Sequence, residues 1–316
     1  MRSECINLNF KFVKMSKLII AIHGLGNKPP KNQLREWGKM AIQEGLKLQG
    51  YNVELPEFKL VYWADLIYDR PQTTDEPDKN SPYFLDEVYT KTPKNYRFES
   101  HEFRKYFVEF FKVVAYKIFL KKDYHLRYAI VSQKLMHKYF HELDVYFNGD
   151  SNSGSSFSFQ TKEKIIKRLD SALAKHAKDE IMLIAHSMGS IIAFDVLSFI
   201  NQTAKIDTLV TMGAPLGAPF VISRIASHSK STYGKIRIQT SESVQNKWLN
   251  FSDIRDNIAV DYKLSNDFGP NSKGIKCIDK LVTNTYVMNG VANPHKSYGY
   301  LRTPEFIEVL AEFIKQ

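Results

Sequence analysis

The sequence predicts an α/β protein with a mainly parallel central sheet flanked by helices. Apolar runs of strand length alternate along the chain with longer segments in which apolar residues recur at helical spacing. This alternation is typical of strand–helix–strand units, whose strands pair in parallel. The chain has 316 residues, of which 43% are hydrophobic and 25% charged. Such a composition allows a substantial core and excludes disordered, collagen-like and coiled-coil proteins.

The first part of the chain supplies a strand, a loop, a helix and a second strand. Residues 18–22 (LIIAI) are wholly apolar and stop at the Gly/Pro loop of residues 23–30 (HGLGNKPP), which predicts a buried strand ending there. Apolar residues at helical spacing predict a helix over residues 33–48, and residues 58–63 predict the next strand. Residues 1–16 precede this order, and we expect them to form an N-terminal extension.

A helical cap insertion is expected over residues 65–155, within a domain that spans residues 17–316. Residues 69–100 are rich in Pro, Asp, Asn, Lys and Thr, which marks a polar connection. Residues 101–147 then contain 13 of the 41 aromatic residues, with nine Lys/Arg and five Asp/Glu, and their apolar positions follow helical spacing. Residues 148–156 have the composition of a flexible linker and close the insertion.

The alternation of helices and strands resumes after the insertion. Helical spacing of apolar residues predicts helices over residues 161–178, 189–201 and 304–314. Apolar runs predict strands over residues 181–185, 208–212, 248–251 and 285–288.

The most informative motif is Ala185-His186-Ser187-Met188-Gly189, which lies between a predicted strand and a predicted helix. It has the form G-x-S-x-G with Ala in the first position. A nucleophilic serine at such a turn is held in a strained conformation, so the residues two before and two after it must be small. The alternative is a serine that only caps the following helix. The strand before it and the helix after it favour the nucleophile.

Four separated segments resemble the α/β-hydrolase superfamily, in particular its lipase-like, serine-esterase branch. They are residues 20–27 (IAIHGLGN), 185–189 (AHSMG), 210–217 (VTMGAPLG) and 293–298 (NPHKSY). The resemblance implies an α/β-hydrolase fold whose mainly parallel sheet is flanked by helices and carries a helical cap. It also implies the triad order of serine, acid and histidine along the chain.

This resemblance assigns a role to three residues. Ser187 would be the nucleophile, and His295, between the last predicted strand and the last helix, would be the base. Residues 247–259 (KWLNFSDIRDNIA) are similar to the family's W-x-N strand and its acid loop, in which the Asp six residues beyond Asn250 is Asp256. Asn257 stands where the family usually has Pro. The acidic residues that remain as alternatives are Asp253, Asp261 and Asp267.

The resemblance also identifies residues around the triad. The backbone amides of Leu25 and Met188 would form the oxyanion hole, and the expected site-lining residues are His23, Gly24, Gly26, His186, Gly213 and Pro215. His23 and His186 are the nearest rivals of His295 as the base. We expect the ring of His186 to point away from Ser187 and that of His23 to brace its own loop.

The expected activity is that of a serine hydrolase that cleaves carboxylic esters, including lipid esters, through an acyl-enzyme intermediate. A thioesterase or acyltransferase would use the same triad, and a binding protein that kept the fold and lost turnover remains a further alternative. No cofactor is expected. Cys5 and Cys277 lie too far apart in the sequence to specify a metal site. The loop of residues 261–271 (DYKLSNDFGPN) has oxygen ligands but lacks EF-hand spacing, so a calcium site is not expected there.

The expected partners follow from charge. The formal net charge is +10, and the basic, aromatic-rich residues 101–147 suit a lid that contacts an anionic membrane surface peripherally. No nucleic-acid-binding motif is recognised, so nucleic acid is not an expected partner. The first twenty residues lack a continuous apolar segment, which favours a cytoplasmic location with a peripheral membrane contact left open.

Overall fold

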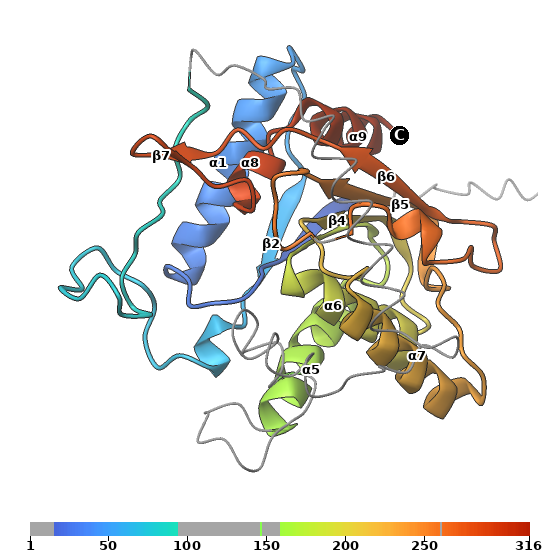
Figure 1. Ribbon diagram of the computed structural model, residues 1–316. Helices are drawn as coiled ribbons and strands as arrows, with labels where there is room; N and C mark the ends of the chain where they lie inside the picture. The colour runs from blue at the N-terminus through green and yellow to red at the C-terminus, as the bar shows by residue number, and fades with distance from the viewer. Residues whose placement is uncertain (1–15, 94–145, 147–158, 260) are drawn as a thin grey trace, which may run out of the picture.

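The computed structural model describes residues 16–93, 146, 159–259 and 261–316 (Figure 1). The predicted N-terminal extension, residues 1–16, lies outside the described residues except for Ser16. Most of the predicted cap, residues 65–155, also lies outside them. The boundaries of the domain and of its cap therefore stay predictions.

A six-stranded sheet, parallel throughout, forms the centre of the molecule and confirms the predicted fold class. Its order is β2-β1-β3-β4-β5-β6, so the chain moves from β1 to one neighbour and then returns to the other side of β1. In open parallel sheets, ligands bind at the carboxyl ends of the strands where such a reversal occurs. The strands are β1 (Lys17–Ile22), β2 (Glu57–Val61), β3 (Glu180–His186), β4 (Ile206–Met212), β5 (Val244–Ser252) and β6 (Cys277–Leu281).

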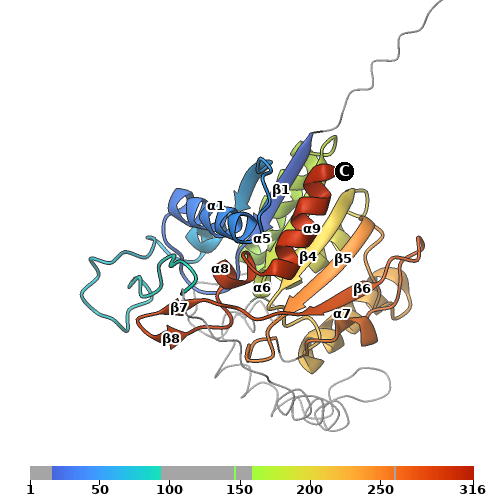
Figure 2. The ribbon, with the colours of Figure 1, turned by 90° about the horizontal axis from the view of Figure 1, so that it is seen from above.

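Helices cover both faces of the sheet, because successive strand side chains point to opposite sides. Leu18, Ile20 and Ile22 of β1 belong to one buried cluster, whereas Ile19 and Ala21 belong to a second. The first cluster includes residues of α5 (Phe159–Lys175), α6 (Met188–Asp195) and α7 (Pro219–Tyr233). The second includes residues of α1 (Lys31–Leu48) and α9 (Pro304–Lys315), which lie together on the other face (Figure 2).

Shorter elements complete the described chain. These are the 3-10 helices η1 (Ala64–Leu66) and η3 (Leu264–Asn266), the π-helical turn η2 (Val196–Ile200) that continues α6, the short helix α8 (Ser297–Tyr300), and the strands β7 (Val287–Met288) and β8 (Val291–Ala292). The prediction that residues 285–288 form a strand of the central sheet was wrong. Only β7 forms there, and it pairs antiparallel with β8 rather than with the central sheet. The sixth sheet strand is instead β6, which the sequence analysis did not predict.

Residues 67–93, which we call the strap, follow η1 and end where the undescribed segment begins. The strap is fixed to the body by the buried guanidinium of Arg302, which bonds to Glu44 Oε2 at 3.0 Å and to Thr90 O at 2.5 Å. Glu44 also accepts hydrogen bonds from the Tyr89 hydroxyl and the Thr92 amide. The strap is therefore part of the packed structure. Within the described residues, no helix is long and apolar enough to cross a membrane.

Substitution of two glycines of α1 by alanine should change the free energy of unfolding in opposite directions. At Gly45 a Cβ atom would lie 2.7 Å from Ile307 of α9 and 2.9 Å from the Arg302 backbone, so Gly45→Ala should lower the free energy of unfolding by about 1–3 kcal/mol. At Gly38 the nearest atom, in the Phe58 ring, would be 3.5 Å away. Gly38→Ala should therefore gain about 0.5–1 kcal/mol from helix propensity. Urea unfolding of both variants tests the pair, and equal effects would contradict the tight packing of α1 on α9.

Candidate active site

Ser187 occupies the sharp turn between β3 and α6. Its backbone has φ 54° and ψ −128°, and Asn289 is the only other non-glycine with positive φ in the part of the chain that the structure describes. A β-carbon in this region of conformational space is strained, so the surrounding contacts must hold it there. The Ser187 amide donates to Met212 O at 2.9 Å, and Ser190 N and Oγ donate to Ser187 O at 2.9 and 2.6 Å.

Two glycines allow the chain to close around this turn. A Cβ atom on Gly189 would lie 2.7 Å from Ile22 O, so the first turn of α6 can approach the end of β1 only without a side chain. A Cβ atom on Gly24 would lie 2.6 Å from Ser187 Cβ and 3.1 Å from its Oγ. The loop after β1 therefore lies directly against Ser187.

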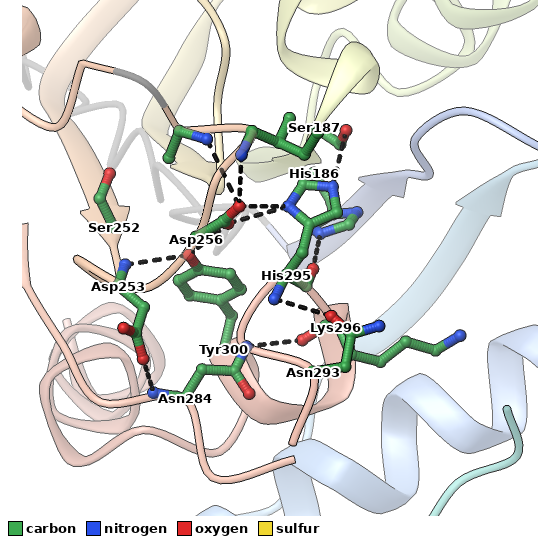
Figure 3. A network of polar contacts seen from close by, with 12 residues as sticks. His186, Ser187, Ser252, Asp253, Asp256, Asn284, Asn293, His295, Lys296 and Tyr300 are labelled. Carbon is green, nitrogen blue, oxygen red and sulfur yellow. Dashed lines mark hydrogen bonds and ion pairs between the residues drawn. The ribbon is translucent and has the colours of Figure 1, made fainter. Parts of the chain in front are cut away.

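Ser187, His295 and Asp256 form one line of hydrogen bonds (Figure 3). The distance from Ser187 Oγ to His295 Nε2 is 3.0 Å, and His295 Nδ1 lies 2.8 Å from Asp256 Oδ2 and 3.0 Å from Oδ1. The three residues come from the ends of β3 and β5 and from the loop before α8. The structure thus brings together the three residues that the sequence predicted. Ser187 and His295 are 108 positions apart in the chain.

The Asp256 carboxylate is held by several donors inside the protein. Its side chain has 0% exposure. Oδ1 accepts the Ile258 amide at 2.9 Å, and Oδ2 accepts the Tyr300 hydroxyl at 2.7 Å. Burial acts to raise the pKa of Asp256, but the hydrogen bond and charge of His295, followed by the Tyr300 bond, outweigh it and keep the pKa below its ordinary value. Asp256 therefore stays ionised at neutral pH.

Asp253, the first alternative acid, faces a different partner. Its carboxylate forms a salt bridge with the Arg255 guanidinium at 2.5 Å and accepts the Asn284 amide at 2.7 Å. It also accepts the Arg255 amide, which closes the turn. Among the described alternatives Asp261 has a comparable local role, because it accepts the Lys263 amide and packs against Gly217. The amide of Asp267 donates to Leu264 O at 3.0 Å, at the end of η3.

His186 and His23 hold backbone atoms rather than the serine. His186 Nε2 lies 2.7 Å from His295 O, and burial lowers the pKa of His186 to about 3, so its neutral ring donates Nε2–H to that carbonyl. His23 Nε2 accepts the Trp63 amide at 2.9 Å, which leaves Nδ1–H to donate to Gly24 O at 2.8 Å. Burial also places the pKa of His23 well below its usual value.

Gly213 lies at the contact between Asp256 and His295. It has φ 54°, and an added Cβ would lie 2.7 Å from Asp256 Oδ2 and 3.1 Å from His295 Nδ1. The absence of a side chain at the end of β4 therefore lets Asp256 and His295 meet. Pro215 is buried in the following turn and is not among the residues that line the cavity next to Ser187. Gly213 is likewise absent from that cavity lining, and the expectation that Gly213 and Pro215 line the site stays a prediction.

A family model described as "PGAP1-like alpha/beta domain" matches residues 105–263, about half of the 316 residues. The chain belongs to this family. The family is of α/β-hydrolase type, which confirms the resemblance seen in the motifs and supports a hydrolase in general. The match includes Ser187 and Asp256, and it also includes residues 105–155, which belong to the predicted cap. No curated protein and no solved structure matches the chain significantly.

The PGAP1-like domain has a cavity of about 470 Å³ beside Ser187 and His295. Its lining includes the expected His23, Gly24, Gly26 and His186, together with Leu25. The strap, which belongs to the predicted cap over residues 65–155, supplies another wall: Tyr68, Gln72, Pro82, Asp86 and Glu87. Among the described residues, no group of three or more His, Cys, Asp or Glu side chains could hold a metal ion.

Glu87 of the strap binds the loop that carries His295. Its carboxylate accepts Asn293 Nδ2 at 2.6 Å and Lys296 Nζ at 2.7 Å. Asn293 Oδ1 in turn accepts the His295 amide at 3.0 Å. Burial acts to raise the pKa of Glu87, but the nearby Lys296 charge and these bonds outweigh it and lower that pKa. Glu87 was missed in the sequence because its partners lie about two hundred residues away and no local motif marks it.

Tyr300 was also missed. It ends α8, and its hydroxyl lies between the two aspartates of the acid loop, donating to Asp256 Oδ2 at 2.7 Å and accepting the Asp253 amide at 2.9 Å. Burial, followed by the charge of Asp256, raises the pKa of Tyr300 well above its usual value, so the hydroxyl stays protonated. The resemblance covers residues 293–298 and ends just before this side chain.

Because His186 is neutral in the folded protein, we expect the free energy of unfolding to depend on pH. Its pKa is about 3 in the folded protein, against about 6.5 in an unfolded chain. The unfolded state therefore binds more protons, and stability that is complete above pH 6.5 is lost as the pH falls toward 3. His186→Asn should make the fall of the unfolding free energy between pH 6 and pH 4 shallower by about 1 kcal/mol per pH unit. Urea unfolding across this range measures the slope, and equal slopes in the two proteins would contradict a neutral buried His186.

Proposed function

We propose that this PGAP1-like domain is a serine hydrolase that cleaves carboxylic esters through Ser187, His295 and Asp256. The observation that carries the proposal is the line of hydrogen bonds from Ser187 Oγ through both ring nitrogens of His295 to Asp256. A nucleophile, a base and an anion that orients the base are the parts that acyl transfer needs. The strained backbone of Ser187 and the α/β-hydrolase type of the family support the same activity.

The first step is attack by Ser187 on the ester carbonyl. Because Asp256 is ionised, it accepts Nδ1–H of His295 and leaves Nε2 unprotonated, facing the serine hydroxyl. Nε2 takes the hydroxyl proton as Oγ bonds to the carbonyl carbon, and the electron pair of the C=O bond moves to its oxygen. Asp256 then stabilises the imidazolium that has formed.

The oxyanion is proposed to accept the amides of Leu25 and Met188. Met188 is the first residue of α6, where amide groups have no partner within the helix. The peptide that carries the Leu25 amide is oriented by its other end, because His23 Nδ1–H binds Gly24 O. In a trans peptide the C=O and N–H bonds point in opposite directions, so this contact turns the Leu25 N–H away from His23. Each such donor is worth about 10²–10³ in rate.

The second half of the reaction regenerates the serine. The alcohol leaves with the proton from His295 Nε2, and an acyl group stays on Ser187 Oγ. Water then gives a proton to Nε2 as its oxygen attacks the acyl carbon, and the acid is released when Oγ recovers that proton. The proposed contact of residues 101–147 with anionic membranes, the use of lipid esters and the cytoplasmic location rest on the sequence alone, because that segment, apart from Tyr146, lies outside the described residues.

Removal of the Ser187 hydroxyl tests the nucleophile. Ser187→Ala should abolish labelling by a fluorophosphonate probe and lower the turnover of a soluble nitrophenyl ester by about 10⁴ or more. Ser190→Ala is the matched control, because Ser190 lies one turn along α6 and its Oγ binds the Ser187 carbonyl rather than His295. We expect that control to stay within about tenfold of the wild type. Labelling or turnover that survives in folded Ser187→Ala would sink the assignment.

A pair of substitutions distinguishes the two aspartates of the acid loop. Asp256→Asn should lower kcat on the order of 10³–10⁴, because an amide favours the wrong tautomer of His295. Asp253→Asn removes a carboxylate that binds Arg255 and not His295, so its effect should appear mainly as a lower Tm. Kinetics and thermal unfolding of both variants measure the difference. The acid would be reassigned if Asp253→Asn lost turnover and Asp256→Asn kept it.

A further inference from the structure

We propose that Tyr300 is a positioning residue that holds the Asp256 carboxylate against His295 and sets the lower pH limit of the reaction. This inference rests on the proposed function, because it gives Tyr300 a part in the same acid–base pair. Tyr300 comes five residues after His295 and ends α8, so the element that follows the base returns to contact the acid. Figure 3 shows its hydroxyl between Asp256 and Asp253.

The direction of the hydrogen bond is determined by its neighbours. The amide of Asp253 can only donate, and it points to the Tyr300 oxygen at 2.9 Å. The hydroxyl proton is therefore free to go to the carboxylate, and Asp256 Oδ2 lies 2.7 Å away. Each of the two contacts supports the other, because a hydroxyl that accepts a hydrogen bond becomes a better donor.

Oδ2 of Asp256 depends on the Tyr300 hydroxyl as a hydrogen-bond donor. Within the described structure it has two recorded partners, His295 Nδ1 at 2.8 Å and the Tyr300 hydroxyl at 2.7 Å, whereas Oδ1 also accepts the Ile258 amide. The Asp256 side chain has 0% exposure and the Tyr300 residue is fully buried, so water cannot reach the bond from the surface. Loss of the hydroxyl leaves a buried carboxylate with one partner fewer.

The effect on the base follows from the charge of Asp256. A donor on Oδ2 disperses the negative charge of the carboxylate and so weakens its attraction for a proton on His295. Without that donor the carboxylate would stabilise the imidazolium more strongly and would be held only by His295 and the amides of its own loop. Neutral imidazole would then be available only at higher pH, and its orientation would be less constant.

Other charged groups near the acid do not replace this contact. His186 faces the triad from β3 and stays neutral, because burial lowers its pKa to about 3. Asp253 lies on the same loop, and its charge is matched by Arg255 at 2.5 Å. His295 is the base itself. Tyr300 thus provides a neutral donor to Asp256 whose removal leaves the formal charge of the site unchanged.

The test is the pH profile of kcat/KM for a soluble ester in wild type, Tyr300→Phe and Tyr286→Phe. Tyr300→Phe should move the acid limb upward by about half to one pH unit, and it should lower kcat about tenfold with little change in KM. Tyr286 is the matched control, because it is also fully buried and its hydroxyl binds Val88 O at 2.6 Å instead of the acid. An unmoved limb in Tyr300→Phe, or the same movement in both variants, would overturn the proposal.

A double-mutant cycle separates action through Asp256 from a general loss of packing. In an Asp256→Asn background, Tyr300→Phe should have almost no further effect on residual turnover, because its partner is already changed. Additive losses would show that Tyr300 acts elsewhere. If Tyr300→Phe does not fold, a fluorinated tyrosine at position 300 keeps the bond with a more acidic hydroxyl, and it should move the acid limb downward.

A measurement without turnover keeps this inference distinct from the proposed function. The proton between His295 Nδ1 and Asp256 should give a low-field NMR resonance whose position changes as the imidazole titrates. The midpoint of that change should rise in Tyr300→Phe and not in Tyr286→Phe, whether or not the protein hydrolyses esters. If the wild type shows no ester turnover and the midpoint still rises, the proposed function fails and the role of Tyr300 stands. If the midpoint does not rise, the role of Tyr300 fails.

Discussion

The strained turn at Ser187 is the constraint on which the rest of the site depends. A serine with φ 54° is stable only where neighbouring elements hold it, and here the holding contacts come from the ends of two neighbouring strands, β4 and β1. Met212 O at the end of β4 accepts the Ser187 amide, and the end of β1 lies against Gly189. The loop after β1 presses Gly24 against the serine itself. The order β2-β1-β3-β4 makes these strand ends neighbours, so the sheet topology and the turn support each other.

A second constraint is the buried carboxylate of Asp256. Burying a charge without partners is costly, and the structure meets that cost with donors from three places: the acid loop itself, His295, and Tyr300 on α8. Asp253, in the same loop, is buried with its own partner Arg255 and bonds to the Asn284 amide. Asn284 Nδ2 reaches Lys296 O, next to His295. The contacts of Asp253 with Asn284 and of Asn284 with Lys296 therefore join the two loops in addition to the hydrogen bond between Asp256 and His295.

Much of this arrangement could be predicted from the sequence, and the exceptions have physical reasons. The strands β1 and β3 are buried on both faces, so their continuous apolar runs mark them clearly. β6 is an edge strand with the sequence CIDKL and mostly exposed side chains, so no such run marks it, whereas apolar residues 285–288 pack outside the sheet. Ser187 could be found because its requirement for small neighbours is local. Tyr300 and Glu87 could not, because their partners lie 44 and about two hundred residues away.

His295 is held by its backbone, and its ring is left to contact Ser187 and Asp256. The His295 amide donates to Asn293 Oδ1, and its carbonyl accepts Nε2–H of the neutral His186. Glu87 of the strap binds Asn293 on its other side, so this support reaches the far wall of the cavity. Both ring nitrogens are then available, one for Asp256 and one for Ser187. The backbone contacts determine where His295 lies, and the contacts of its ring with Asp256 and Ser187 determine how the imidazole is oriented and which nitrogen carries the proton.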